Sequence, residues 1–120
     1  MHVGITGAGT GIGRAIALRL ASEGASLSLY GRRLAPLEET AAGLGVDVRC
    51  FAVDVRKPAI DRAVERAAEA LGPLAGFVAN AGIGGPNEPG PGDRFEELVS
   101  TNLVGTYNSL RAAERHLAED

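Results

Sequence analysis

The stretch that decides the fold of this chain is Thr6-Gly7-Ala8-Gly9-Thr10-Gly11-Ile12-Gly13, which directly follows a short apolar segment at residues 2–6. Three of its glycines, Gly7, Gly11 and Gly13, fall at fixed offsets where a strand is expected to turn into a helix. Glycine lets the backbone come close to a pyrophosphate, and the N-terminus of the helix directs its partial positive charge at the phosphates. The stretch therefore predicts a strand, a phosphate-binding turn and a helix in succession.

The spacing within this stretch excludes two common nucleotide-binding patterns. The general dinucleotide pattern G-x-G-x-x-G fails because Ile12 and Arg14 stand where its third glycine would fall. The phosphate-loop pattern of nucleoside triphosphatases fails because no lysine follows the glycines. The pattern that does match is Thr-Gly-x-x-x-Gly-Ile-Gly.

Composition and charge favour an α/β protein and argue against several classes of partner. Apolar residues make up 45% of the 120 residues, with 3 Phe, 2 Tyr and no Trp, which is typical of helices packed closely on a parallel sheet. A net charge of −3 gives no reason to expect nucleic acid or an anionic membrane as a partner. Met1-His2 leads straight into a strand rather than a signal peptide, and no apolar run is long enough to cross a membrane. We therefore expect a cytoplasmic protein without a membrane partner, in which the single Cys50 is a buried thiol.

Alternating strand and helix patterns predict the order of the elements. Strands are expected at residues 2–6, 27–30, 46–53 and 74–79, and helices at 12–23, 34–42, 58–71 and 93–118. Right-handed crossovers between the strands give a Rossmann-type, doubly wound parallel sheet of order 3-2-1-4. We expect residues 1–120 to form a single domain of this α/β class.

The last predicted helix carries an apolar stripe with one amide inside it. The stripe is expected to be buried and consists of Phe95, Leu98, Val99, Leu103, Leu110, Ala113 and Leu117. Asn102 falls within this stripe. By itself this position predicts a core asparagine bonded to a neighbouring helix turn, because an unpaired buried amide costs about 1–3 kcal/mol.

Three further motifs follow the glycine turn in a set order. They are Asp54-Val55 after the third predicted strand, Ala79-Asn80-Ala81-Gly82 after the fourth, and Asn102-Leu103-Val104-Gly105-Thr106 in the last helix. Each motif alone is weak, because such short sequences occur in ordinary loops. In this order, over essentially the whole chain, the four motifs resemble the short-chain dehydrogenase/reductase family. The resemblance implies an NAD(P)-dependent oxidoreductase that moves a hydride between C4 of the nicotinamide and a carbonyl or secondary alcohol carbon.

The resemblance also implies a set of site residues. Asp54 would accept a hydrogen bond from the adenine amino group, the alternative being a cap that leads into the next helix. Asn80 would hold the end of the fourth strand beside the first. Asn102, the one catalytic residue expected here, would help to anchor a proton-relay water near a catalytic lysine; no metal is expected. The residues expected at the coenzyme are Gly7, Thr10, Gly11, Ile12, Gly13, Arg32, Arg33, Asp54, Val55, Asn80, Ala81 and Gly82.

The end of the second strand favours NADP over NAD as the coenzyme. A carboxylate there would bond the ribose hydroxyls and repel a 2′-phosphate. This chain has Gly31 followed by Arg32-Arg33 instead, and guanidinium groups bind phosphate in a bidentate fork. NAD stays the alternative, because many NADP-dependent relatives carry a basic residue where this chain has Thr10, and a solvated charged turn would also explain the arginines.

The residues that such enzymes use for proton transfer are absent from these 120 residues. The family works through a Ser and a Tyr-x-x-x-Lys, whereas the only lysine here is Lys57. The nearest match runs from Tyr107 to Arg111 and ends in a guanidinium that does not exchange protons at useful pH. We therefore expect the N-terminal part of an enzyme, incomplete at its C-terminus and inactive alone, with the catalytic Ser, Tyr and Lys downstream of Asp120. The alternatives are a non-catalytic dinucleotide-binding module and a scaffold that pairs with an active homologue.

The resemblance further implies partners. The substrate would be a small-molecule carbonyl or alcohol, whose identity the sequence leaves open. Subunits would associate as a homodimer or homotetramer through the helix at 93–118. In that arrangement Ser109, Arg111, Glu114 and Arg115 would be partly buried between subunits.

Overall fold

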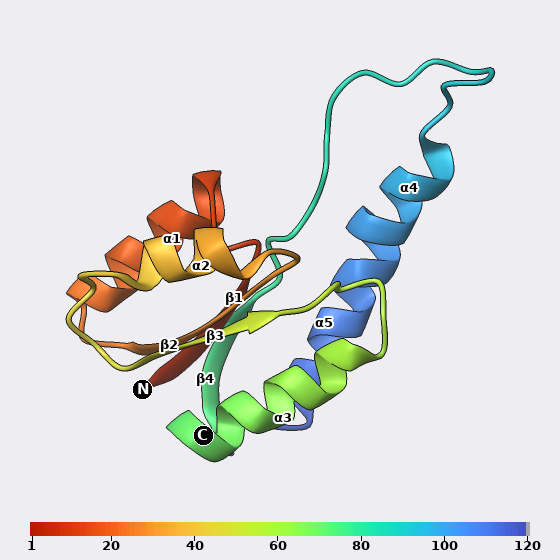
Figure 1. The fold of residues 1–120 in the computed structure, drawn as a ribbon. Coiled ribbons are helices and arrows are strands. Elements are labelled where there is room, and N and C mark those ends of the chain that lie inside the picture. Colours follow the sequence, from red (N-terminus) through yellow and green to blue (C-terminus); the bar gives the residue numbers. More distant parts are fainter. Residues whose placement is uncertain (120) are drawn as a thin grey trace.

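The computed structural model describes residues 1–119, in which four parallel strands form one sheet with helices on both faces (Figure 1). β1 (His2–Thr6) lies in the middle, paired with β2 (Ser26–Gly31) on one side and β4 (Leu74–Val78) on the other. β3 (Val48–Ala52) pairs with the free side of β2. The resulting order, β3-β2-β1-β4, confirms the predicted 3-2-1-4 arrangement.

The helices form two layers, one on each face of the sheet (Figure 1). α1 (Gly11–Ser22) and α2 (Leu34–Ala41) cover one face over a core that includes Ile5, Leu27, Leu29 and Leu37. α3 (Ala59–Leu71) and α5 (Gly105–Glu114) cover the other over Tyr30, Val64, Leu74 and Ala112. Cys50, predicted to be buried, is half-buried beside the first core, and burial raises the pKa of its thiol. No helix within residues 1–119 is both long enough and apolar enough to cross a membrane.

A buried polar network joins β1 to β2 at the end of the sheet opposite the glycine turn. The imidazole of His2 is 2% exposed, with Nδ1 at 2.8 Å from the carbonyl oxygen of Gly72 and Nε2 at 2.7 Å from Oγ of Ser28. A carbonyl oxygen only accepts, so Nδ1 carries the proton and Nε2 accepts from the Ser28 hydroxyl. Ser28 accepts in turn from the hydroxyl of Tyr30 at 2.9 Å. The neutral imidazole therefore satisfies every group in the network.

Acidification is expected to destabilise the protein through His2. Burial lowers the pKa of His2 below 6.5 in the folded state, so the unfolded chain binds a proton that the folded chain resists. This contribution to stability is complete above about pH 6.5 and is lost as the pH falls from there towards the folded-state pKa, by up to about 1.4 kcal/mol per pH unit. Urea unfolding at pH 7.5 and pH 5.5 measures it. The difference in the free energy of unfolding between pH 7.5 and pH 5.5 should be smaller in His2→Gln than in the wild type and unchanged in His116→Gln. An equal difference in the wild type and in His2→Gln would refute the role of His2.

The last helix differs from the predicted one in extent and in form. It begins at Phe95 and ends at Glu114, rather than spanning 93–118, and it contains α4 (Phe95–Val99), a π-helical turn η1 (Ser100–Val104) and then α5. Beyond α5, Leu74 donates its backbone N–H to the carbonyl of His116 and accepts from the N–H of Ala118. Backbone pairing beside β4 thus replaces the final helical turn.

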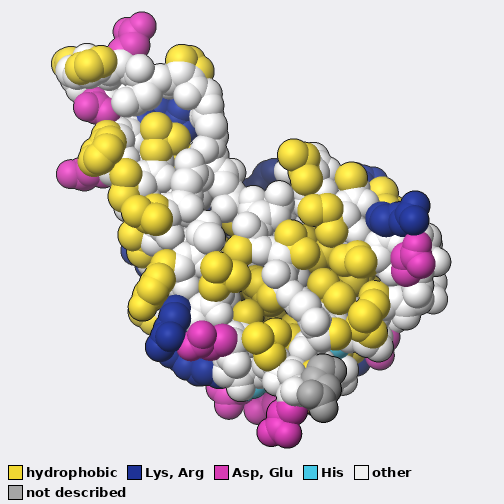
Figure 2. All heavy atoms as spheres, turned by 180° about the vertical axis from the view of Figure 1, so that it is seen from behind, with side chains coloured by type: hydrophobic (Ala, Val, Ile, Leu, Met, Phe, Trp, Pro, Cys, Tyr) yellow, Lys and Arg dark blue, Asp and Glu magenta, His cyan; other side chains and the backbone are white. Residues whose placement is uncertain are grey.

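The apolar stripe predicted on this helix is largely exposed. Phe95 is 65% exposed, Leu103 67% and Leu110 50%. The π-helical turn interrupts the regular 3.6-residue pattern after Val99, but Phe95 lies before that turn and is exposed as well, so the turn alone does not account for the exposure. α5 packs on α3, and the buried residues of α5 are small. A Cβ on Gly105 would lie 2.6 Å from Cγ2 of Val55, in the segment that precedes α3. The part of the molecule that carries α4 projects from the body, and Figure 2 shows hydrophobic side chains along it. The buried residues of α5 are Gly105, Ser109, Ala112 and Ala113.

Candidate functional site

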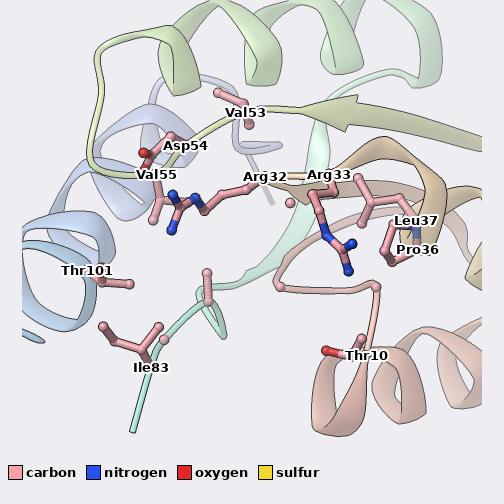
Figure 3. A pocket seen from close by; sticks show the side chains of 15 residues that line it. Thr10, Arg32, Arg33, Pro36, Leu37, Val53, Asp54, Val55, Ile83 and Thr101 are labelled. Atoms are coloured by element: carbon pink, nitrogen blue, oxygen red, sulfur yellow. The ribbon is translucent and has the colours of Figure 1, made fainter. Parts of the chain in front are cut away.

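A cavity of about 210 Å³ opens at the C-terminal ends of the parallel strands (Figure 3). It lies where the strand order reverses between β1 and β4, which is the place where open α/β sheets bind ligands. The segments that follow all four strands contribute to it, together with one residue of η1. The lining consists of Gly7, Gly9, Thr10, Gly31, Arg32, Arg33, Pro36, Leu37, Val53, Asp54, Val55, Ala81, Gly82, Ile83 and Thr101.

Two close backbone approaches shape the turn after β1. Gly7 has φ 66°, and a Cβ on it would lie 2.9 Å from Cα of Ala81. A Cβ on Gly13 would lie 2.2 Å from the carbonyl oxygen of Gly7 and 2.6 Å from Nδ2 of Asn80. Glycine at these two positions therefore lets the first turn of α1 and the end of β4 both rest directly on the turn.

The side chain of Asn80 ties the end of β4 to the end of β1. Its Nδ2 donates to the carbonyl oxygens of Thr6 at 3.2 Å and Gly7 at 3.3 Å. The hydroxyl of Thr6 accepts from the backbone N–H groups of Asn80 and Ala81, both at 2.9 Å. These bonds confirm the expectation that Asn80 joins the two strand ends, although its side chain does not line the cavity.

Asp54, which follows β3, presents a carboxylate held by Arg56. Nε of Arg56 donates to Oδ1 at 3.0 Å and Nη2 donates to Oδ2 at 2.7 Å, while the Arg56 backbone N–H donates to Oδ1 at 2.9 Å. Hydrogen bonding from the Arg56 side chain outweighs burial and, with a smaller contribution from Arg32, lowers the pKa of Asp54 to about 2. The carboxylate is therefore an acceptor at neutral pH. The alternative role as a cap is wrong, because α3 begins at Ala59 and these oxygens bond to Arg56.

Arg32 and Arg33 extend from the turn after β2 into the cavity. Figure 3 shows Arg32 pointing towards Asp54 and Val55, and Arg33 pointing towards Thr10 near the start of α1. Both side chains are exposed, and neither forms an ion pair with any residue in the described range 1–119. This end of the cavity thus carries two positive charges that can meet an anion.

Asn102 lies on η1 and fixes the loop after β4. Its Oδ1 accepts from the N–H of Ile83 and its Nδ2 donates to the carbonyl of Ile83, both at 2.8 Å. The backbone carbonyl of Asn102 accepts from the hydroxyl of Thr106 at 2.7 Å. The residue is exposed, so the stripe-based prediction of a core asparagine is wrong, and its amide bonds the loop residue Ile83 rather than the helix turn that this prediction expected.

The cavity brings together most, but not all, of the residues predicted from the sequence. Those that line it are Gly7, Thr10, Arg32, Arg33, Asp54, Val55, Ala81 and Gly82. Those that lie outside its lining are Gly11, Ile12, Gly13, Asn80 and Asn102. The cavity also includes Ile83, from a loop that the sequence indicated as one side of the pocket, and Gly31, which the sequence placed at the end of the second strand. The residues that the sequence did not indicate are Gly9, Pro36, Leu37, Val53 and Thr101. Most of these are small or apolar, and only Gly9 belongs to a motif, the glycine turn.

The arrangement suits one elongated ligand that carries phosphate groups in one part and a heterocycle in another. A glycine turn at a helix N-terminus, together with two guanidinium groups, favours phosphate groups. An ionised carboxylate at the other side of the arginines favours a heterocycle that donates hydrogen bonds. Apolar side chains such as Leu37 and Val53 add surface against which a flat ring can pack.

Comparisons with known proteins agree with this arrangement. The family model described as short chain dehydrogenase matches residues 1–120. A 3-dehydrosphinganine reductase of Arabidopsis thaliana is 36% identical over 118 residues, which cover 93% of this chain and 35% of that protein. The structure of an NAD⁺-bound xylitol dehydrogenase is 31% identical with a TM-score of 0.89, over 96% of this chain and 47% of that one. An alcohol dehydrogenase from the archaeon Thermococcus sibiricus, complexed with 5-hydroxy-NADP, is 33% identical with a TM-score of 0.85, over 96% and 52%. The chain spans less than half the length of three curated relatives that it matches, this reductase among them, with 35% to 46% of each covered.

Proposed function

Because the chain belongs to the short-chain dehydrogenase family, we propose that it supplies the coenzyme-binding part of an NAD(P)-dependent oxidoreductase. The observation that carries the proposal is the convergence of the glycine turn, Arg32, Arg33 and Asp54 on one cavity at the strand ends. The coenzyme would accept or deliver a hydride at its nicotinamide. The whole protein would interconvert a small-molecule carbonyl and a secondary alcohol.

The residues of this chain would hold the coenzyme in three places. The glycine turn, with Thr10, Gly11, Ile12 and Gly13 at the start of α1, would carry the pyrophosphate through backbone N–H groups and the helix dipole. The segment Asp54-Val55 would meet the adenine, with the carboxylate accepting from the amino group. Ala81 and Gly82, as small residues at the end of β4, would leave room for the nicotinamide half to cross the strand ends.

Arg32 and Arg33 support NADP as the coenzyme, with NAD as the alternative. Both side chains reach the cavity, and the turn after β2 holds no carboxylate that would repel a 2′-phosphate. Calorimetric titration of the full-length protein with NADP and with NAD tests the proposal. We expect both to bind, NADP at least ten times more tightly. Tighter NAD binding would overturn the coenzyme preference, and no binding of either would overturn the proposed function.

The proton-transfer step would depend on residues beyond Asp120. Tyr107, the nearest local match, is 62% exposed and lines a groove between α3 and α5 rather than the cavity. It therefore cannot reach a substrate in the cavity. Asn102 would act indirectly, because it holds Ile83 on the rim and offers a backbone carbonyl on η1 near the place where the missing tyrosine and lysine are expected.

The exposed face of the last helix supports association of subunits as a homodimer or homotetramer. Leu103, Tyr107 and Leu110 are each half or more exposed on it. Ser109 would not take part, contrary to the expectation from sequence, because it is buried within the chain and donates to the carbonyl of Gly105. Arg111 and Glu114 are exposed but pair with each other at 2.6 Å, and Arg115 pairs with Asp61 at 2.8 Å, so these three would meet a second subunit as ion pairs already formed within the chain. Light scattering of the full-length protein would contradict this arrangement if it found a monomer.

A further inference from the structure

We propose that Arg56 is a positioning residue for the adenine end of the coenzyme site: its guanidinium fixes the Asp54 carboxylate so that the site takes a 6-aminopurine and rejects a 6-oxopurine. The inference rests on the proposed function and goes beyond it, because Arg56 lies outside the cavity lining and acts only through Asp54. The ligand class concerned is a dinucleotide whose purine donates a hydrogen bond from position 6.

The geometry of the pair is that of a two-point fork. Nε of Arg56 donates to Oδ1 at 3.0 Å and also to Oδ2 at 3.1 Å, Nη2 donates to Oδ2 at 2.7 Å, and the backbone N–H donates to Oδ1 at 2.9 Å. Two parallel bonds prevent rotation of the carboxylate in a way that a single contact does not. The side chains are partly shielded, with 27% of Arg56 and 22% of Asp54 exposed. The orientation of the Asp54 oxygens is therefore set by Arg56.

The backbone next to Asp54 is held from the same outer side. Nδ2 of Asn108 on α5 donates to the carbonyl oxygen of Val55 at 3.0 Å. Arg56 and Asn108 both line the groove between α3 and α5, which is separate from the coenzyme cavity. The two residues that would face adenine are thus fixed by groups behind them, and the Arg56 fork fixes the one that carries the charge.

A fixed and ionised carboxylate distinguishes purines by what they present at position 6. An amino group donates to it, whereas an oxo group places a second acceptor against an anion that has no proton to donate. If the carboxylate can turn aside, the bond to the amino group and the repulsion of the oxo group both weaken. Loss of Arg56 should therefore narrow the difference between the two purines rather than weaken both equally.

The test compares NADP with its hypoxanthine analogue, deamino-NADP, on the full-length protein by calorimetry. The wild type should bind NADP at least ten times more tightly than deamino-NADP, because a hydrogen bond is exchanged for a clash of acceptors. Arg56→Gln should weaken NADP binding about tenfold and bring the ratio of the two affinities to about 3 or less. Arg56→Lys should behave like Arg56→Gln, because it keeps the charge but loses the fork.

Arg49→Gln is the matched control, because Arg49 also bonds an aspartate two residues before it, Asp47, but on exposed surface away from the cavity. It should leave both affinities unchanged. Equal weakening of NADP and deamino-NADP in Arg56→Gln would assign Arg56 a merely structural role and overturn the proposal, as would wild-type affinities in that variant or in Arg56→Lys. If the wild type binds neither coenzyme, the proposed function fails. If it binds both equally while favouring NADP over NAD, only the inference about Arg56 fails.

Discussion

Gly13→Ala is expected to lower the free energy of unfolding by about 3 kcal/mol and to abolish coenzyme binding. The added Cβ would stand 2.2 Å from the carbonyl oxygen and 2.8 Å from the carbonyl carbon of Gly7. Both are backbone atoms of the turn, so neither can swing aside as the end of a side chain would. α1 would have to move off the turn and off Asn80, whose Nδ2 lies 2.6 Å from the same point. A loss of this size is large for a domain whose total stability is about 5–15 kcal/mol.

Urea unfolding measures the stability change, and two other glycines supply controls. Gly84 has open space around it and no positive φ, so Gly84→Ala should leave the unfolding midpoint unchanged. Gly11 also meets nothing within 4 Å but has φ 53°, so Gly11→Ala should cost only about 1–2 kcal/mol of left-handed strain. If Gly13→Ala unfolded at the same urea concentration as Gly84→Ala, the close approach of α1 to the turn would not be the reason that position 13 requires glycine.

The sheet and the glycine turn were predictable because their signals are local. A buried parallel strand such as β1 is a short apolar run. The glycines that follow it predict a turn whose backbone conformation requires glycine. The chirality of strand–helix–strand crossovers then leaves few possible strand orders. For this reason the order β3-β2-β1-β4 and the meeting of Gly7, Asp54 and Ala81 at one edge follow from the sequence pattern.

The last helix was not predictable in the same way, because nothing in its sequence pattern shows that a π-helical turn interrupts it. Leu103 and Leu110 fit a 3.6-residue stripe with the residues before them, yet both are exposed, as is Phe95, which lies before η1. The face that packs on α3 contains Gly105 and Ser109, which carry almost no hydrophobic signal. Packing here depends on a close contact with the side chain of Val55, in the segment before α3, which leaves no room for a Cβ on Gly105.

The Arg56 fork shows the same limit at the site. Asp54 stands out in the sequence as an acid after a strand, whereas an arginine two residues later resembles any solvated charge. The backbone after β3 places the two side chains within hydrogen-bond distance, and the bonds from Arg56 lower the pKa of Asp54 to about 2. Sequence patterns therefore identify the group that would touch the ligand more readily than the group that orients it.

Replacing both Arg32 and Arg33 with alanine is expected to weaken NADP binding about 100-fold and to leave NAD binding within about threefold of the wild type. Each guanidinium can make charge-assisted hydrogen bonds to a 2′-phosphate, which are about twice as strong as neutral ones, and NAD has no such group. Both side chains reach into the cavity (Figure 3). The preference should thus invert in favour of NAD, as measured by calorimetry with each coenzyme on the full-length protein.

A control for the loss of two positive charges is the double variant Arg19→Ala, Arg62→Ala. Both residues are exposed on α1 and α3 and pair with glutamates on their own helices, away from the cavity. This control should reduce NADP affinity only slightly, through the weaker long-range attraction that salt screens. If the Arg32/Arg33 variant lost NADP and NAD affinity together, the two arginines would act on a part common to both coenzymes, such as the pyrophosphate or the adenine. If the variant lost NADP affinity alone, the choice of coenzyme would depend on the turn after β2 rather than on Thr10 in the glycine turn.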